Sequence, residues 1–469
     1  MENEDKKRKE LKINGKQINR RNFLKVLGAG SVVTGAALAG CKRNNNTVSA
    51  EGGSIGEVPT DKMTYRINPH TSDRVSLLGY GCMRWPLRQK PDGSGEEVDQ
   101  DAVNELVDYA IAHGVNYFDT APVYVRGWSE TATGIALSRH PREKYFVATK
   151  MSNMRVTSFE DGVAMYRKSM RDLQVDYIDY YLLHSVGSSM EDLQRRFIDN
   201  GLLEFLKQER KAGRIRNLGW SFHGVAEVFD YVLAMDIQWD FCQIQLNYQD
   251  WKYATGRNVN AEYLNAELVK KNVPAIIMEP LLGGRLARVP QQALDLMRSV
   301  HQHDTAAKWA FRYAGTPENV LTVLSGMVYM EHLQENIRTY SPLQPINEQE
   351  NETLEQVTQI LINSDYIQCT DCQYCMPCPY GIDIPGVFGH YNRCVSAGKL
   401  LKSSNDENYR KARREFLVGY DRSVPKLRQA DHCIECNECI PKCPQNIKIT
   451  EEMRRVNKYA ELLKREMQF

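Results

Sequence analysis

The sequence predicts an α/β fold followed by a smaller cysteine-rich unit, and three observations support this prediction. From Tyr65 onward, apolar strand-like segments alternate with amphipathic segments of helical period, such as 99–114 and 158–174. Eight strands, each followed by a helix, make a (β/α)8 barrel the simplest architecture. Beyond the barrel, eight of the twelve cysteines form two groups between Cys369 and Cys443.

The predicted strands are short apolar runs. They are residues 75–81, 115–120, 145–150, 177–184, 215–221, 241–247, 274–280 and 321–327. In a barrel of parallel strands the carboxyl ends all meet at one face, where such folds place their chemistry. Side chains at these ends are therefore the first candidates for a functional site.

Three of the predicted strands end in ionisable side chains. VNYFDT reaches Asp119, YFVATK ends at Lys150 and YIDYYLLH ends at His184, and Tyr124 follows the first of them in a predicted loop. A phenol donates a proton poorly near neutral pH, but a nearby ammonium lowers its pKa, and a carboxylate keeps that ammonium charged. His184 can orient a carbonyl by hydrogen bonding. Each residue alone would more often be an ordinary strand-end or loop side chain.

Five short motifs around these residues occur in a characteristic order: FDTAPVY, FVATK, YYLLHS, GWSFHG and QIQLNY. Together they resemble the aldo-keto reductase family over roughly residues 63–341. The resemblance implies a catalytic tetrad of Asp119, Tyr124, Lys150 and His184. It also implies hydride transfer between a nicotinamide coenzyme, NADP or NAD, and a small-molecule carbonyl or alcohol substrate.

The same resemblance implies where the nicotinamide binds. Ser221 after the fifth strand and Gln243 on the sixth match positions that hold the carboxamide. Met278 stands where many members stack a tyrosine on the ring, and Phe222 replaces the asparagine commonly found beside that serine. These departures concern the packing of the ring and leave the predicted fold unchanged.

The far end of the coenzyme is implied to contact the last strand, loop and helix, residues 325–337. Gly326, Glu335 and Asn336 occupy the positions expected for phosphate and adenine contacts. Members that bind a 2′-phosphate usually have lysine or arginine just after that glycine, where this sequence has Met327. Because that cation is missing, the choice between NADP and NAD stays open.

Both cysteine groups have the spacing of iron–sulfur ligands. The first, CTDCQYCMPCP, has gaps of two residues throughout, and the second, CIECNECIPKCP, ends with a gap of three. The predicted ligands are Cys369, Cys372, Cys375, Cys378, Cys433, Cys436, Cys439 and Cys443. The clustering argues against a disulfide scaffold. Structural zinc is the alternative, but it normally uses two separated C-x-x-C pairs.

The cysteine pattern resembles that of bacterial two-cluster ferredoxins, in which the fourth cysteine of each run ligates the other cluster. The resemblance implies two 4Fe-4S clusters in a small ferredoxin-like domain. It assigns one cluster to Cys369, Cys372, Cys375 and Cys443, and the other to Cys433, Cys436, Cys439 and Cys378. A redox partner protein or another electron carrier is the expected partner.

The N-terminal segment has the layout of an export signal. NRRNFLK, Asn19 to Lys25, precedes an apolar run, Val26 to Ala39, that is short for a membrane span. It resembles a twin-arginine signal, and the following LAGC resembles a lipobox that would leave Cys41 lipidated. The sequence therefore predicts a periplasmic protein or a lipoprotein held at a membrane only through Cys41. The alternative is a disordered basic tail followed by a small buried helix.

Five segments are expected from these assignments. They are a signal peptide at 1–41, a flexible linker at 42–62, the barrel at 63–345, a linker helix at 346–365 and the iron–sulfur domain at 366–469. Lysine and arginine number 60 and aspartate and glutamate 59, with no basic stripe interleaved with aromatics, so we expect no nucleic-acid partner.

The two halves together predict an oxidoreductase whose hydride transfer is coupled to electron transfer through the clusters. A competing hypothesis is a non-enzymatic iron–sulfur carrier with the barrel as a docking or ligand-binding scaffold, although a scaffold has no use for a charged relay at strand ends. A third possibility keeps the enzyme and makes the clusters structural. Trp128, Trp251 and Tyr253 are expected near the substrate, where they can stack on a sugar or aromatic ring, although exposed aromatics in loops are often only packing.

Overall fold

The computed structural model describes residues 12–13, 16–17, 57–154, 158–256, 258–401, 405 and 407–465. The chain divides into two units, Met1–Glu57 and Val58–Phe469. In the first unit, β1 (Lys12–Ile13) and β2 (Lys16–Gln17) pair as antiparallel strands. The remainder of the predicted export signal, including Cys41, and the linker up to residue 56 lie outside the described residues.

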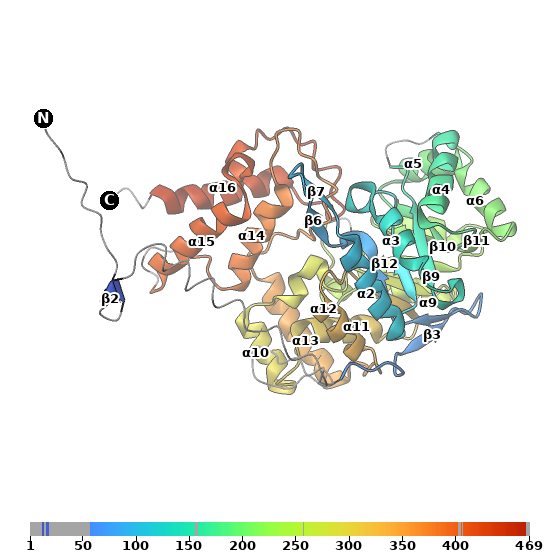
Figure 1. The fold of residues 1–469 in the computed structure, drawn as a ribbon, viewed down its shortest axis with the longest axis horizontal. Helices are drawn as coiled ribbons and strands as arrows, with labels where there is room; N and C mark the ends of the chain where they lie inside the picture. The colour runs from blue at the N-terminus through green and yellow to red at the C-terminus, as the bar shows by residue number, and fades with distance from the viewer. Residues whose placement is uncertain are drawn as a thin grey trace, which may run out of the picture. The chain divides into compact units, whose positions relative to one another are not determined.

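Eight parallel strands of the second unit close into a barrel in chain order (Figure 1). They are β5 (Leu78–Gly81), β8 (Tyr117–Asp119), β9 (Phe146–Met151), β10 (Ile178–Val186), β11 (Ile215–Phe222), β12 (Phe241–Gln245), β13 (Ala275–Met278) and β14 (Val320–Ser325). Each overlaps one of the predicted strands. The predicted (β/α)8 barrel is therefore confirmed.

Amphipathic helices surround the strands. They are α2 (Gln100–Ala112), α3 (Ser129–Leu137), α4 (Phe159–Leu173), α6 (Leu202–Lys211), α7 (Ala226–Ala234), α9 (Ala261–Lys270), α10 (Gln291–Val300), α11 (Ala306–Gly315) and α12 (Met330–Thr339). In α4, for example, the Ser158 side chain caps the first turn by accepting from the Asp161 amide, and Val163, Tyr166 and Leu173 are buried. The apolar faces of helices and strands together form the main hydrophobic core.

Shorter elements lie in the connections and outside the barrel. The helical turns are η1 (Cys82–Arg84), η2 (Tyr124–Gly127), η3 (Arg142–Lys144), α5 (Met190–Leu193), the π-helical η4 (Gln194–Ile198), α8 (Asp250–Tyr253) and η5 (Leu282–Ala287). Two antiparallel hairpins are formed by β3 (Tyr65–Ile67) with β4 (Arg74–Ser76) and by β6 (Leu87–Gln89) with β7 (Glu96–Val98).

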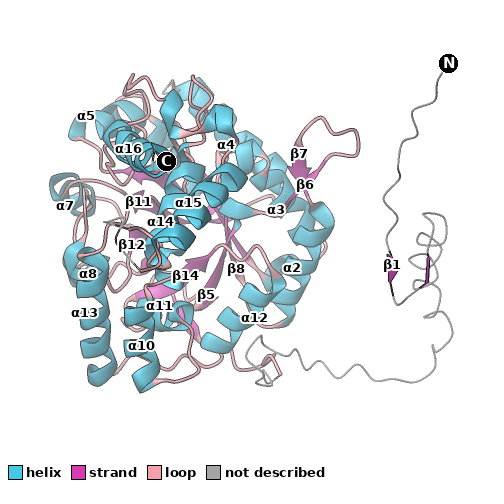
Figure 2. Ribbon diagram, turned by 90° about the vertical axis from the view of Figure 1, so that its left-hand side faces the viewer, coloured by secondary structure: helices cyan, strands magenta, loops and turns pink. Residues whose placement is uncertain are grey.

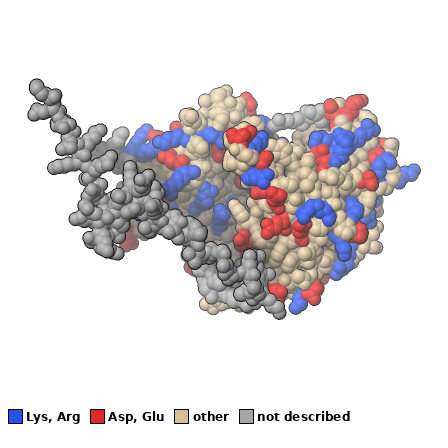
Figure 3. Space-filling model, in the orientation of Figure 1, with Lys and Arg blue, Asp and Glu red and all other residues tan. Residues whose placement is uncertain are grey.

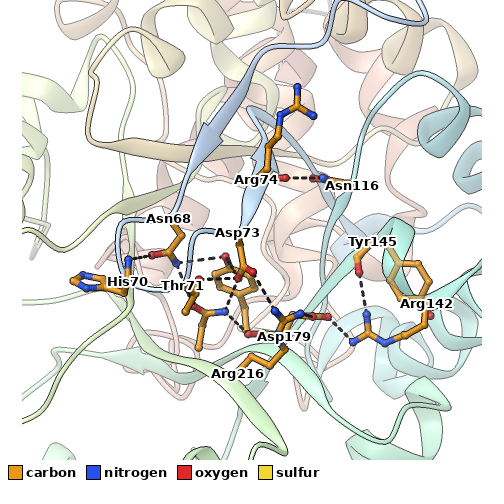
Figure 4. A network of polar contacts seen from close by, with 12 residues as sticks. Asn68, His70, Thr71, Asp73, Arg74, Asn116, Arg142, Tyr145, Asp179 and Arg216 are labelled. Carbon is orange, nitrogen blue, oxygen red and sulfur yellow. Dashed lines mark hydrogen bonds and ion pairs between the residues drawn. The ribbon is translucent and has the colours of Figure 1, made fainter.

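The β3–β4 hairpin closes the amino-terminal end of the barrel with a polar network, shown in Figure 4. Between the two strands, the buried Asp73 accepts hydrogen bonds from Tyr180 and Asn217, each at 3.0 Å. Arg216 bridges Asp73 and Asp179 at 3.3 and 3.2 Å. These contacts join the hairpin to the first residues of β10 and β11.

The barrel interior is filled by side chains. Tyr117, Tyr180, Phe241 and Ile276 pack there from four different strands. The Tyr180 ring lies 5.0 Å from the Tyr117 ring and 5.2 Å from the Phe241 ring, in edge-to-face contacts. The interior is a packed core, so a ligand has to bind at the mouth of the barrel.

Helix α13 (Glu348–Ile362) connects the barrel to the C-terminal domain. Asn347 and Glu350 form a capping box at its first turn, and Glu350 also accepts hydrogen bonds from Arg312 at 2.8 and 2.9 Å. On its buried face, Leu354 and Val357 join a hydrophobic cluster with residues of α10 and α11. The helix is thereby fixed to the outside of the barrel.

The C-terminal domain is built from helices and cysteine-containing loops. It contains α14 (Ile384–Ser396), α15 (Tyr409–Ser423) and α16 (Ile449–Arg465), with the turns η6 (Lys426–Arg428) and η7 (Ala430–His432). Figure 2 shows the three helices in front of the barrel strands. They enclose a core of their own, to which Phe388, Phe416 and Met453 contribute. The first cysteine group precedes α14 and the second precedes α16.

Basic and acidic side chains are interspersed over the face of the second unit shown in Figure 3. This distribution agrees with the formal net charge of +1. Among the residues that the structure describes, no helix combines the length and apolar character needed to cross a membrane.

Candidate functional site

The four residues of the predicted tetrad come together at the carboxyl ends of the strands. Asp119 ends β8, and Tyr124 begins η2 in the loop that follows. Lys150 lies on β9 and His184 on the neighbouring β10. Lys150 Nζ donates to Asp119 Oδ1 at 2.5 Å and to the Thr120 carbonyl at 3.0 Å, and it lies 5.3 Å from the centre of the Tyr124 ring. The rings of Tyr124 and His184 are 5.9 Å apart.

Burial dominates the ionisation of these groups. It raises the pKa of Tyr124 well above its ordinary value, and nearby Tyr374, Asp119 and Glu279 act in the same direction. The net shift is therefore upward, opposite to the lowering predicted from Lys150. Burial also raises the pKa of Asp119 and lowers that of Lys150, while the ion pair between them opposes both shifts. The Tyr124 phenol accordingly keeps its proton near neutral pH.

His184 is held neutral and oriented. Its Nδ1 lies 2.6 Å from Ser152 Oγ, and its backbone carbonyl accepts a hydrogen bond from Arg196 at 2.6 Å. Burial lowers the pKa of His184 well below its ordinary value, and the charges of Lys150 and Arg196 lower it further. Both ring nitrogens have a hydroxyl partner, Ser152 at Nδ1 and Tyr374 at Nε2. In the tautomer in which the Ser152 hydroxyl donates to Nδ1, the ring proton lies on Nε2.

The residues predicted to hold the nicotinamide lie on the next strands. Ser221 on β11 and Gln243 on β12 are aligned in register, and both are buried. The Ser221 hydroxyl accepts a hydrogen bond from the Ser185 amide at 2.7 Å. Among the described residues, Gln243 Oε1 is buried with no hydrogen-bond partner, which leaves it available to an amide of a ligand. Met278, at the end of β13, is half-buried.

The residues predicted for the far end of the coenzyme lie after β14. Gly326 follows the strand directly, and Glu335 and Asn336 are on α12. The Asn336 amide donates to Ser325 Oγ at 3.0 Å, and the Glu335 carboxylate accepts from the Thr305 hydroxyl. Both α12 side chains are therefore engaged with the protein itself.

Four of the cysteines line one cavity, and they are the four that the sequence assigns to one cluster. The cysteines of this cavity are Cys369, Cys372, Cys375 and Cys443, and its apolar wall includes Ile384, Phe388 and Ile447. The remaining four, Cys378, Cys433, Cys436 and Cys439, are close enough to one another that charge on one raises the pKa of another.

Both cysteine groups begin with the same backbone loop. Four residues at matching places have a left-handed conformation, with φ between 53° and 64°: Asp371, Gln373, Glu435 and Asn437. The Asp371 amide donates to Cys369 Sγ at 3.4 Å, and the Glu435 amide donates to Cys433. Such N–H···S bonds stabilise cluster-bound thiolates. The all-cysteine donor set, together with these N–H···S bonds, fits an iron–sulfur cluster. In the described part of the chain, no three His, Cys, Asp or Glu side chains converge as they would around one metal ion.

The first cysteine loop packs on the mouth of the barrel. Arg84, in η1, donates to the Thr370 carbonyl at 2.8 Å and forms an ion pair with Asp371 at 3.0 Å. The stem of Arg84 lies against Gly326. Gly283, in η5, approaches Thr370 so closely that a Cβ would lie 2.3 Å from the Thr370 carbonyl oxygen. These contacts bring the loop next to the predicted coenzyme residues.

Tyr374 extends from the same loop into the tetrad. Its hydroxyl lies 3.2 Å from His184 Nε2 and also forms a side-chain hydrogen bond with Tyr124. Sequence reasoning missed both Tyr374 and Arg84, because their roles depend on contacts between distant parts of the chain. The only available signal was a tyrosine between two predicted cluster ligands, Cys372 and Cys375.

Two of the predicted substrate aromatics contact other side chains of the protein. The Trp251 ring packs edge-to-face on Tyr313 at 6.2 Å, and the Tyr253 hydroxyl donates to Glu355 of α13 at 2.5 Å. These contacts favour the packing alternative for the two rings, and stacking on a substrate stays a prediction. Trp128 precedes α3 and is partly exposed.

Two family models match the chain. The model of the aldo/keto reductase family matches residues 77–359, which is more than half of the chain. The model of the 4Fe-4S dicluster domain matches residues 368–448. The first match covers the barrel strands and α13, and the second covers all eight predicted cluster ligands.

The chain is also similar to individual proteins. Protein tas from Escherichia coli (strain K12) is 29% identical over 204 residues, which are 37% of this chain and 56% of that protein, so the chain spans little more than half of it. L-galactose dehydrogenase from Arabidopsis thaliana is 27% identical over 328 residues, 64% of this chain and 95% of that protein. An aldo-keto reductase from Bacillus halodurans in its holo form has a TM-score of 0.50 at 23% identity, over 63% of this chain and 96% of that one. This last likeness shows the fold.

Proposed function

The chain belongs to the aldo/keto reductase family, and on that basis we propose that it moves hydride between a nicotinamide coenzyme and a small carbonyl or alcohol. It also carries a C-terminal 4Fe-4S dicluster domain, through which we propose that it exchanges electrons with a partner protein or carrier. One observation carries this proposal. The buried tetrad lies at the mouth of the barrel in direct contact with the first cysteine loop.

In this proposal Tyr124 donates a proton to the carbonyl oxygen, or takes it back in the reverse direction. Its raised pKa keeps the phenol protonated until a substrate accepts the proton. The Lys150 ammonium, fixed by Asp119, lies beside the ring and stabilises the negative charge that develops as the proton leaves. Neutral His184 donates its Nε2–H to the same oxygen and sets the direction of the carbonyl.

Ser221, Gln243 and Met278 would hold the nicotinamide, and the unpaired oxygen of Gln243 supports this assignment. When bound, the coenzyme supplies or accepts the hydride. Gly326, with Glu335 and Asn336, would contact the phosphate and adenine end. The Arg84 stem lies against Gly326, so a cation is close to the expected phosphate contact although the residue after Gly326 is not basic. Either NADP or NAD is compatible with this arrangement.

The two sets of cysteines would hold two 4Fe-4S clusters, which supply one-electron transfer when bound. The first set is Cys369, Cys372, Cys375 and Cys443, and the second is Cys433, Cys436, Cys439 and Cys378. The shared cavity of the first set and the matching N–H···S loops of both groups support this assignment.

We further propose export by the twin-arginine route and a lipid anchor at Cys41. Free nicotinamide coenzyme is not expected outside the cytoplasm, so an exported enzyme has to retain its coenzyme. The contacts that Arg84 and Gly283 make with the first cysteine loop support retention, because they cover the mouth of the barrel. Nucleotide that stays with the protein through gel filtration is the expected result, and its complete loss would contradict retention.

Anaerobic purification of the mature protein tests the proposed function. Iron and sulfide are assayed, any released nucleotide is identified, and NAD(P)H is then titrated while the cluster absorbance is followed. If the barrel and the cluster domain form one electron path, we expect the coenzyme to bleach the clusters: each NAD(P)H oxidised releases one proton and two electrons, one for each of the two proposed clusters. If iron and sulfide are present in full but the cluster absorbance does not change with NAD(P)H, the clusters are structural or serve another reaction.

A further inference from the structure

Tyr374 places an oxygen atom of the protein inside the tetrad. Its hydroxyl lies 3.2 Å from His184 Nε2 and is hydrogen-bonded to Tyr124. The His184 and Tyr374 rings meet nearly edge to face, 6.4 Å apart at 77°. The hydroxyl therefore interacts with both groups that the proposed function assigns to the substrate oxygen.

A carbonyl oxygen that receives a proton from Tyr124 has to lie within hydrogen-bond distance of it, about 2.6–3.2 Å. If His184 Nε2 orients the same oxygen, the oxygen site is the space between these two side chains. The Tyr374 hydroxyl occupies that space in the described structure. A phenolic oxygen accepts hydrogen bonds as a carbonyl does, so Tyr374 is an internal ligand of the oxygen site.

The same residue is bonded to the cluster loop through its backbone. Tyr374 lies between Cys372 and Cys375, and its amide donates to the Cys372 sulfur. Hydrogen bonds to cluster sulfurs help to set the reduction potential, since they stabilise the more negative reduced state. A movement of Tyr374 out of the tetrad would alter this bond.

We propose that Tyr374 competes with the substrate for the oxygen site, so that a bound carbonyl compound displaces it. This displacement lowers the reduction potential of the neighbouring cluster, which is the one held by Cys369, Cys372, Cys375 and Cys443. This inference rests on the proposed function. Tyr374 is a positioning residue in it, because it acts through the cluster loop and leaves the site when the substrate enters. Binding of a substrate in the barrel thereby changes the reduction potential of the cluster.

Binding of a carbonyl probe without a reducible substituent, benzaldehyde, to the cluster-loaded protein tests the competition. Tyr374→Phe removes only the competing hydroxyl and keeps the ring, and Tyr380→Phe makes the same change at an exposed tyrosine that follows Cys378. Since the hydroxyl contributes two hydrogen bonds, we expect Tyr374→Phe to bind the probe about ten-fold more tightly. Tyr380→Phe should bind it as the unmodified protein does. Equal or weaker binding in Tyr374→Phe would overturn the competition.

Anaerobic redox titration followed by electron paramagnetic resonance tests the link to the cluster. Saturating probe should lower the midpoint potential of the unmodified protein, and a ten-fold coupling corresponds to about 59 mV for a one-electron couple. Probe-free Tyr374→Phe should already lie near the probe-bound value, because nothing holds its ring in the tetrad. A potential that does not respond to the probe would overturn the link.

Hydrogen–deuterium exchange on the unmodified protein needs no variant. The probe should speed exchange in the segment 370–376, because displacement of Tyr374 breaks the amide bond to Cys372. Unchanged exchange at saturating probe would contradict displacement.

Failure of this inference is distinguishable from failure of the proposed function. The proposed function is decided by turnover in Tyr124→Phe and by the response of the clusters to the coenzyme.

Discussion

The two ends of the barrel are both closed by a segment from outside it, but the closing contacts differ in kind. At the amino-terminal end, every side-chain oxygen and nitrogen of Asn68, Asp73 and Asn217 has a partner. At the carboxyl end, Asp119 Oδ2 and Gln243 Oε1 are buried without one among the described residues. The network around Asp73 is complete, although Arg142 Nε and the Tyr117 hydroxyl at the same end are buried without a partner among the described residues. The carboxyl end differs because its unpaired atoms belong to the predicted tetrad and coenzyme residues.

The difference between the two ends predicts that one end contributes mainly to stability and the other mainly to function. Unpaired buried polar atoms cost free energy, so they persist where a ligand completes them. Changes at the amino-terminal end should therefore act on the free energy of unfolding, and changes at the carboxyl end should act on turnover and binding. Four predictions follow, from the largest fold-change to the smallest. The first two test this separation, and the other two concern a buried histidine and the cysteines at the carboxyl end.

The largest effect is expected from removing the Tyr124 hydroxyl. Tyr124→Phe should lower turnover of small aldehydes and ketones by about 10²–10⁴-fold, because it removes the proton donor. Tyr180→Phe is the matched control at the other end, where the lost bond to Asp73 should cost about 1 kcal/mol of unfolding free energy and leave turnover unchanged. Equal loss of turnover in both variants would contradict the separation.

The next effect concerns stability. Asp73→Ala should lower the free energy of unfolding by about 2–4 kcal/mol, because Tyr180 and Asn217 lose a buried acceptor. Asp371→Ala breaks the half-exposed ion pair with Arg84 at the carboxyl end and should cost only about 0–1 kcal/mol. Urea denaturation of both variants measures the difference. A larger cost for Asp371→Ala would reverse the assignment of roles.

Acid should weaken the carboxyl end through His223, which follows β11. Burial lowers the pKa of His223 to about 4 in the folded protein, whereas the unfolded residue takes up a proton near pH 6.5. Its contribution to stability is therefore complete above about pH 6.5 and declines as the pH falls toward 4. Between pH 7 and 5.5 the loss should be about 1 kcal/mol, and His223→Gln should lack this part of the loss in urea denaturation. An identical pH dependence in the variant would show that His223 does not carry it.

The smallest fold-change is a halving of the iron content. Cys443→Ala and Cys378→Ala should each lose about half of the iron, since each cysteine completes one cluster. Cys443 shares a cavity with Cys372 and Cys375, the ligands that flank Tyr374. Only Cys443→Ala should therefore remove the cluster next to the tetrad and, with it, the bleaching of that cluster by NAD(P)H. The opposite result would mean that the two runs do not exchange their fourth cysteines.

The barrel and the tetrad could be predicted because they depend on local patterns. Each strand is a short apolar run, and the closed parallel barrel brings strand ends together wherever Asp119, Lys150 and His184 lie in the sequence. The cysteine spacing predicted iron–sulfur ligands, and the resemblance to two-cluster ferredoxins assigned them to two sets. The structure brings the tetrad together and places the cysteines of one set around one cavity, while the cluster ligands stay a prediction.

Contacts between the barrel and the cluster domain could not be predicted, because no sequence pattern specifies which surface a second domain covers. Arg84 and Tyr374 gain their roles only from that contact. The pKa of Tyr124 was misjudged for the same reason. Sequence reasoning placed an ammonium near the phenol, but burial, to which the cluster domain contributes through Tyr374, determines the direction of the shift.

The anchoring of α13 has a kinetic consequence for the first cysteine loop. Arg312 and the cluster around Leu354 hold the helix to the barrel, and only residues 363–368 separate its end from Cys369. A tether this short gives the loop a high effective concentration at the barrel mouth. A separate electron carrier would need an equally high free concentration to occupy the same place as often. In the proposed competition, the short tether therefore returns Tyr374 to the tetrad faster than a free protein can reach that site.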